Sequence, residues 1–224
     1  MLVVNFKTYE NGTGRKGLEL AKVIDYIARK NKDVEIVIAV QHTDIKEISG
    51  AVSIPVYAQH IDGIVYGSNT GFILPEAVKE AGAKGTLINH SEHRITIDAI
   101  ENAINRAKEV GLKVIACAND PKIAEGVAAL EPDFVAIEPP ELIGSNVSVC
   151  QARPEIIEKS IECVRKVSKD IPILCGAGVH SRDDAKRAIE LGSIGVLVAS
   201  GIVKASNPQK VTLELIHGLI EGSI

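Results

Sequence analysis

Short apolar runs alternate with longer amphipathic segments along the whole chain, and eight such pairs can be counted. Each apolar run is only a few residues long and is bounded by turn residues, which is typical of a buried parallel strand. The following segments carry helical apolar spacing, as at Ile97, Ile100 and Ile104. The predicted strands and their helices are residues 2–4 with 17–30, 34–40 with 44–48, 56–58 with 75–81, 85–88 with 97–110, 113–116 with 121–129, 133–137 with 154–168, 171–174 with 181–191, and 194–198 with 208–221.

Strict alternation of buried strands and amphipathic helices predicts a parallel sheet. Eight repeats within 224 residues favour a closed (β/α)8 barrel, an α/β fold, over an open doubly wound sheet. Because the chain is shorter than the about 250 residues typical of this barrel, its loops and some helices are expected to be shortened. No segment resembles a linker or a low-complexity tract, so residues 1–224 are predicted to form a single domain.

Composition narrows the class of protein. The chain is 46% hydrophobic and 24% charged, as in ordinary globular proteins. A net charge of -4 and the absence of Trp argue against nucleic-acid binding. No apolar run approaches the roughly 20 residues that span a bilayer, and the polar residues soon after Met1 argue against a signal peptide. The cysteines Cys117, Cys150, Cys163 and Cys175 have no Cys-x-x-Cys spacing, which predicts reduced thiols in a cytoplasmic protein without disulfides or zinc.

The residues that follow the predicted strands are the candidates for chemistry, because barrel active sites lie at the face where the strands end. They are polar residues and glycines, and together they are a stronger signal than any one of them. This ring comprises Asn5 and Lys7, Gln41, Gln59 and His60, Asn89 and His90, Asn119, Glu138, residues 176–178 and residues 199–201.

Glu138 follows the apolar run 134–137 and precedes two prolines. Since proline disfavours the helical conformation in the residue before it, Glu138 is predicted to stay extended at the end of its strand. A carboxylate at the mouth of an apolar strand loses solvation, which raises its pKa toward that of a general base. The stiff Pro139–Pro140 entry and the Gly144–Ser145 exit are typical of a moving lid. The alternative is a solvated residue in an ordinary turn.

Two further side chains suit an anionic substrate. Lys7 would place a cation over the barrel mouth, although a lone lysine can also be a surface residue. His90 could act as an acid, an electrophile or a metal ligand. The spacing of His90 and His93 is weak evidence for a metal, so no metal site is predicted and His93 is interpreted as structural or exposed. If Ser91 and Glu92 begin a helical turn, its positive end would favour a neutral His90 imidazole.

Small residues follow the last two predicted strands, at Gly176-Ala-Gly178 and Ala199-Ser-Gly201. With a short helix starting near Ser200–Gly201, their backbone N–H groups would form the phosphate site that many barrels carry at this position. A base, an electrophile, a cation and a phosphate site together suit proton abstraction next to a carbonyl on a small phosphorylated compound.

At this point the chain resembles the triosephosphate isomerase family over nearly its whole length. Asn5-Phe-Lys7 is similar to that family's Asn-x-Lys opening, and residues 90–94 to its His-Ser-Glu-Arg-Arg segment. Residues 137–139 with Ile143–Gly144 resemble its catalytic glutamate and lid, and the two glycine-containing loops fall where its phosphate loops lie.

The resemblance implies roles for these residues in interconverting dihydroxyacetone phosphate and glyceraldehyde 3-phosphate, a step of glycolysis and gluconeogenesis, without a cofactor. Glu138 would shuttle the proton, neutral His90 would polarise the carbonyl and Lys7 would offset negative charge. Asn5, with Phe6 beside it, would hold the substrate. Backbone groups of Ile143, Gly178, Ala199 and Ser200 would bind the phosphate, with Glu92, Gly144, Gly176 and Gly201 in support.

Two departures resemble the compact archaeal branch of the family. Pro140–Glu141 stands where the usual lid has Val-Trp, and the chain is a few helical turns short. Residues 59–71 resemble the long third loop that reaches into a partner subunit, with Thr70 supporting the partner's site. The resemblance therefore implies at least a homodimer and favours a homotetramer.

Two other classes remain open. Another phosphosugar-binding barrel isomerase would need a different acid–base set, typically paired aspartates or a Lys-Glu pair. A non-catalytic barrel that binds a phosphorylated metabolite would have no need of Lys7, His90 and Glu138 together.

Overall fold

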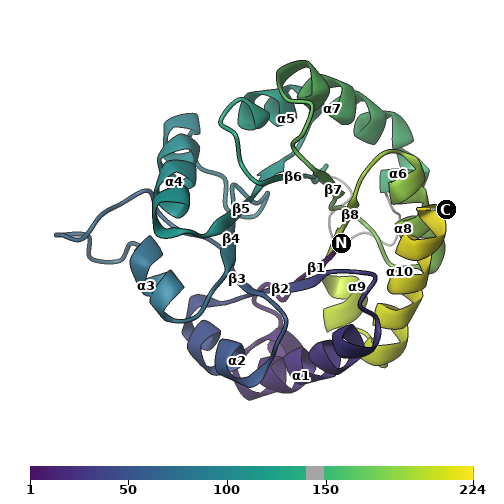
Figure 1. The fold of residues 1–224 in the computed structure, drawn as a ribbon, viewed down its shortest axis with the longest axis horizontal. Helices are drawn as coiled ribbons and strands as arrows, with labels where there is room; N and C mark the ends of the chain where they lie inside the picture. The colour runs from purple at the N-terminus through teal and green to yellow at the C-terminus, as the bar shows by residue number, and fades with distance from the viewer. Residues whose placement is uncertain (140–148, 224) are drawn as a thin grey trace.

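Eight parallel strands close into a barrel in chain order, and β1 pairs with β8 to complete it (Figure 1). The computed structural model describes residues 1–139 and 149–223. The predicted α/β barrel is confirmed. Its strands are β1 (Leu2–Asn5), β2 (Ile36–Val40), β3 (Val56–Ala58), β4 (Gly85–Ile88), β5 (Lys113–Ala118), β6 (Phe134–Ile137), β7 (Ile173–Cys175) and β8 (Gly195–Val198).

A ring of helices surrounds the barrel (Figure 1). The helices are α1 (Gly14–Lys30), α2 (Ile45–Ala51), α3 (Pro75–Glu80), α4 (Ile97–Val110), α5 (Pro121–Ala128), α6 (Val149–Ala152), α7 (Pro154–Val167), α8 (Arg182–Glu190), α9 (Ser200–Val203) and α10 (Pro208–Gly222), with short 3₁₀ turns η1 (Glu10–Gly12) and η2 (His42–Asp44).

The ends of several elements differ from the sequence prediction by a few residues. Helix α1 begins three residues early, directly after the extended Thr13, and α2 continues to Ala51. Strand β7 begins at Ile173 instead of residue 171, after Pro172, which has no N–H for a ladder. Side chains cap the starts of two helices: Ser181 and Asp184 form a capping box at α8, and Asn207 accepts the N–H of Lys210 at α10.

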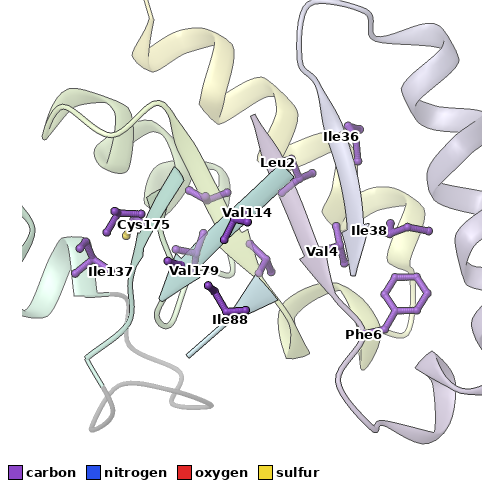
Figure 2. Packing of buried hydrophobic residues seen from close by; sticks show 14 of the residues in the cluster. Leu2, Val4, Phe6, Ile36, Ile38, Ile88, Val114, Ile137, Cys175 and Val179 are labelled. Carbon is purple, nitrogen blue, oxygen red and sulfur yellow. The ribbon is translucent and has the colours of Figure 1, made fainter. Parts of the chain in front are cut away.

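Both faces of the strands are buried, which explains why they read as apolar runs instead of alternating patterns. Along β1, Val3 lies in the barrel interior together with residues from all the remaining strands, such as Leu87 and Leu197. Its neighbours Leu2 and Val4 lie in the outer layer that packs against the helices, which Figure 2 shows from close by. The interior layer fills the barrel, so that only the strand ends open toward solvent.

Asp25 of α1 ties this helix to the loop before β3. Its Oδ1 accepts hydrogen bonds from the Ser53 N–H (2.7 Å), the Ser53 hydroxyl (2.6 Å) and the Ile54 N–H (3.1 Å), and its Oδ2 pairs with Arg29 at 2.7 Å. Burial by itself would raise the pKa of Asp25, but these hydrogen bonds and Arg29 outweigh burial and hold the pKa below its usual value of 3.8.

Asp25→Ala is expected to lower the free energy of unfolding by about 2 kcal/mol, because the buried Ile54 N–H and the partly buried Ser53 N–H lose their acceptor. The folded-state pKa is depressed, so this contribution is complete above the usual pKa near 3.8 and is lost as the pH falls further. Chemical denaturation at pH 7 and at stepwise lower pH measures both effects. Asp33→Ala, at an exposed site just beyond α1, is the control. Equal stability of the two variants at pH 7 would contradict the role of Asp25.

Candidate active site

The predicted side chains meet at the carboxyl ends of the strands, although they lie far apart in the sequence. His90 Nε2 lies 3.2 Å from Glu138 Oε1, and Lys7 Nζ lies 2.7 Å from Glu92 Oε1. Glu92 Oε2 is 3.7 Å from His90 Nδ1, so Glu92 lies between the lysine and the histidine. One connected set of charged and titratable groups therefore crosses the barrel mouth from β1 through β4 to β6.

Glu138 is held at the end of β6 with its side chain 2% exposed. Its N–H donates to the Ala118 carbonyl at 2.8 Å, so the strand ladder continues to this residue, as the following proline predicted. Glu138 Oε2 is buried and has no hydrogen-bond partner within the described part of the chain. Burying a carboxylate oxygen without a partner costs free energy, and such groups are typical of sites that await a ligand.

Two neighbours fix the position of Glu138. A Cβ built on Gly176, which follows β7, would lie 2.6 Å from Glu138 Cγ, so only glycine leaves room for the carboxylate here. The Cys117 thiol of β5 lies fully buried nearby. Burial, and next the Glu138 carboxylate, raise the pKa of Cys117, so this thiol stays protonated and uncharged beside the glutamate.

His90 lies in a single hydrogen-bonded turn, in which the His93 N–H donates to the His90 carbonyl at 2.7 Å. This turn is a single one, since the regular helix begins only at Ile97. Within it, the Glu92 N–H donates to His90 Nδ1 at 3.2 Å. Only an unprotonated Nδ1 can accept this hydrogen bond, which leaves the ring proton of a neutral imidazole on Nε2.

The charges around His90 favour its protonated form instead of the neutral one. Burial lowers the pKa of His90, but the Glu138 carboxylate outweighs burial and the net direction is upward. This upward effect depends on direct contact between the two side chains, at a Nε2 that lacks a hydrogen bond in the described residues. A ligand between the two side chains would weaken the effect of Glu138 and leave the Glu92 hydrogen bond in place.

Asn89 orients this turn. Its backbone has φ of 55°, the left-handed region, which non-glycine residues rarely adopt. The side chain donates to the Cys117 carbonyl at 3.0 Å and accepts the Ile95 N–H at 3.2 Å. Asn89 therefore connects the end of β4 to β5 and to the segment before α4, and it fixes the position from which His90 extends.

Lys7 also has a left-handed backbone, with φ of 48°. Its N–H donates to Asn5 Oδ1 at 2.9 Å, and its carbonyl accepts Gln59 Nε2 at 2.9 Å. Between Asn5 and Lys7, the Phe6 side chain is fully buried in the outer core (Figure 2). Only the backbone of Phe6 is therefore left for the substrate contact predicted from the sequence.

A pocket beside Glu138 is lined by the two small-residue loops, including Gly176, Gly178, Ala199 and Ser200, together with Lys7. Gly178 has φ of 67°, which favours glycine. Helix α9 begins at Ser200, as expected, and the first N–H groups of a helix have no partner within it. A Cβ on Gly201 would lie 2.8 Å from His180 Nδ1 and 3.1 Å from the Val179 carbonyl, so the two loops are in close contact.

The structure does not place three predicted residues in this group. Ile143 and Gly144, with most of the expected lid, lie outside the described residues. Thr70 is exposed in the segment between β3 and α3, which projects away from the ring of helices (Figure 1). Within its own chain the structure does not bring Thr70 to the barrel mouth.

His93 is exposed and its ring stacks on that of His60, with 4.5 Å between the centroids. In residues 1–139 and 149–223, no three His, Cys, Asp or Glu side chains are placed to hold a metal ion. The same ranges contain no helix long and apolar enough to cross a membrane.

Gln59, Asn89 and Cys117 surround the site, and sequence reasoning gave none of them a role there. Gln59 and Asn89 were singled out only as polar residues at strand ends, and Cys117 only as a reduced thiol. Their contacts join different strands, so no local pattern could reveal them.

Comparison with known proteins gives one consistent result. The sequence model of a family described as "Triosephosphate isomerase" matches residues 1–218. Among curated proteins, the chain is 47% identical to a triosephosphate isomerase of Methanocaldococcus jannaschii over 216 residues, which cover 96% of this chain and 98% of that protein. It is 49% identical to one of Methanobacterium bryantii (96% and 95% covered) and 46% identical to one of Metallosphaera sedula (98% and 96% covered).

Proposed function

Because the chain belongs to the triosephosphate isomerase family, we propose that Glu138, His90 and Lys7 are its catalytic residues. The reaction interconverts dihydroxyacetone phosphate and D-glyceraldehyde 3-phosphate, a step of glycolysis. The observation that carries the assignment is the pair of buried atoms without hydrogen-bond partners among the described residues, Glu138 Oε2 and His90 Nε2, at one barrel mouth.

The proposed chemistry moves one proton between two carbons. The Glu138 carboxylate removes a proton from the carbon beside the carbonyl, and the electron pair passes to the carbonyl oxygen to give an enediolate. His90 donates a hydrogen bond from Nε2 to that oxygen and relays protons between the two oxygens. Glu138 then returns its proton to the neighbouring carbon. Lys7 stabilises the negative charge on the enediolate, and Asn5 helps to hold the substrate.

Phosphate binding is assigned to backbone N–H groups of Gly178, Ala199 and Ser200, with Gly201 allowing the close approach of the loops. The left-handed Gly178 and the start of α9 support this part of the proposal. The sequence motif adds Ile143 as a phosphate-binding residue, with Gly144 in support, and both lie outside the described residues. Glu92 is proposed to hold the Lys7 ammonium in place, which its 2.7 Å contact supports.

The test is a coupled assay of glyceraldehyde 3-phosphate conversion by the purified protein, repeated in D₂O. Fast turnover is expected, with deuterium entering the product at the carbon next to the carbonyl, because the shuttled proton exchanges with solvent. A folded protein that binds inorganic phosphate but turns over neither triose phosphate would contradict the proposal and favour a binding role.

We also propose that the chain works in the cytoplasm as a homo-oligomer, which is at least a dimer, and we favour a tetramer. The segment between β3 and α3 supports self-association, because it exposes Val65 (57%), Tyr66 (71%) and Phe72 (57%). Its base is held in position by Arg106 of α4, which donates to the Ile64 carbonyl at 3.0 Å. Large exposed apolar side chains on an anchored loop mark an interaction surface.

The location in the cytoplasm is supported by the cysteines. The thiols of Cys117 and Cys163 are free and buried, which suits a reducing compartment.

The double variant Tyr66→Asp/Phe72→Asp is expected to be monomeric and to lose activity by at least about tenfold. In the monomer this loop no longer lies beside the partner's active site, and displacing groups next to an active site lowers the rate of catalysis. Light scattering and the coupled assay at matched concentrations measure the two effects. Tyr26→Asp, at a tyrosine that is 53% exposed on α1, is the control and should change neither. A fully active monomer would remove Thr70 from any role in a partner's site.

A further inference from the structure

Lys7 adopts a backbone conformation that its side chain does not favour. Its φ of 48° lies in the left-handed region, where the Cβ of an L-residue crowds the following carbonyl. Such conformations persist only where surrounding contacts stabilise them. The contacts around Lys7 therefore decide where its side chain starts and where its ammonium lies.

Both peptide groups of Lys7 are held by side-chain amides. Asn5 Oδ1 accepts the Lys7 N–H at 2.9 Å, and Gln59 Nε2 donates to the Lys7 carbonyl at 2.9 Å. The same Gln59 nitrogen lies 3.3 Å from Asn5 Oδ1 and 3.4 Å from the Ala39 carbonyl. The Gln59 amide, placed directly after β3, thus contacts Asn5 at the end of β1, Ala39 of β2 and the carbonyl of Lys7.

We infer that Gln59 is a positioning residue for Lys7: its amide donor holds the left-handed backbone that places the ammonium at the barrel mouth. Gln59 lines the pocket that contains Asn5, Lys7, His90 and Glu92. Its contribution to catalysis is indirect, because its side-chain amide contacts Asn5, Lys7 and Ala39. This inference rests on the proposed role of Lys7.

A double-mutant cycle tests the coupling. Gln59→Met keeps the length of the side chain and removes the donor, so kcat/KM for glyceraldehyde 3-phosphate is expected to fall about tenfold. In a Lys7→Met background the same change should cost less than about twofold, because the group that it positions is gone. Gln209→Met is the matched control: Gln209 is exposed on α10, away from the strand ends, and the same change there should leave activity unchanged.

Gln59→Glu adds a readout that does not depend on the stability of the methionine variant. An ionised carboxylate would set acceptor against acceptor at the Lys7 carbonyl, whereas the protonated acid regains an O–H donor. The ratio of kcat/KM in this variant to that in the wild type should therefore rise as the pH falls toward the carboxyl pKa, ordinarily about 4.3. The charged and titratable groups that face this position, Lys7, His42, His60, His90, Glu92 and His93, are the same in both proteins, so the wild-type pH profile is the reference for the ratio.

The outcomes separate this inference from the proposal on which it rests. If Lys7→Met retains full activity, the catalytic role of Lys7 fails and the positioning role of Gln59 fails with it. If Lys7→Met is impaired but Gln59→Met costs the same factor in both backgrounds, or the Gln59→Glu ratio does not change with pH, only the inference about Gln59 is overturned.

Discussion

Glu138→Gln is expected to lower kcat for triose phosphate isomerisation by about 10³-fold, with KM changed little. The amide has the shape of the carboxylate but cannot accept a proton from carbon, and acid–base groups of this kind contribute roughly 10²–10⁴-fold. Glu138→Asp keeps the base but withdraws it by one methylene, so it should also reduce kcat severely while substrate binding is retained.

Glu138→Gln is expected to keep or gain stability although it loses activity. Glu138 is 2% exposed and its Oε2 has no hydrogen-bond partner in residues 1–139 and 149–223, so the charged form is costly to bury. The neutral amide removes that charge, and the melting temperature of Glu138→Gln should equal or exceed that of the wild type. The coupled assay and thermal unfolding measure the two effects together.

Glu125→Gln on α5 makes the same chemical change away from the barrel mouth and serves as the control. Near-normal kcat in Glu138→Gln would remove Glu138 from the role of base. A large loss of melting temperature in that variant would instead assign the lost activity to unfolding.

The barrel could be predicted from the sequence because both faces of each strand are covered. Leu2 and Val4 contact the helix layer while Val3 fills the interior, so the strand has no polar position and stands out as an apolar run. The exact ends of the elements depend on contacts between them. Strand β5, for example, continues two residues past its predicted end, to Ala118, because Ala118 pairs with Ile137 of β6.

The main residues of the site could be predicted for a related reason. Once the strands are known to be parallel and closed, their carboxyl ends must lie at one face, and Lys7, His90 and Glu138 are brought together by topology alone. Their detailed geometry could not be predicted. The left-handed backbone of Lys7 depends on Gln59, which is 52 residues away in the sequence, and His90 Nδ1 accepts the N–H of Glu92 within a single turn.

Gly176 also belongs to that geometry, and a single methyl group there is expected to impair catalysis. In Gly176→Ala, the new Cβ would lie 2.6 Å from Glu138 Cγ and 3.3 Å from Cδ, closer than carbon atoms tolerate. The backbone cannot relax easily, because the Gly176 N–H donates to the Ile137 carbonyl at 2.9 Å. Glu138 must therefore rotate away, and a displacement of about 1 Å costs roughly 10²-fold in kcat.

Gly126→Ala is the matched control, since a Cβ there meets no atom within 4 Å. Gly126 lies inside α5, so its replacement should stabilise the protein by about 0.5–1 kcal/mol and leave kcat unchanged. In a Glu138→Gln background, Gly176→Ala should have almost no further effect, because the group that it displaces is already inactive. An equal loss in both backgrounds would show that Gly176 acts on the substrate pocket and not through Glu138.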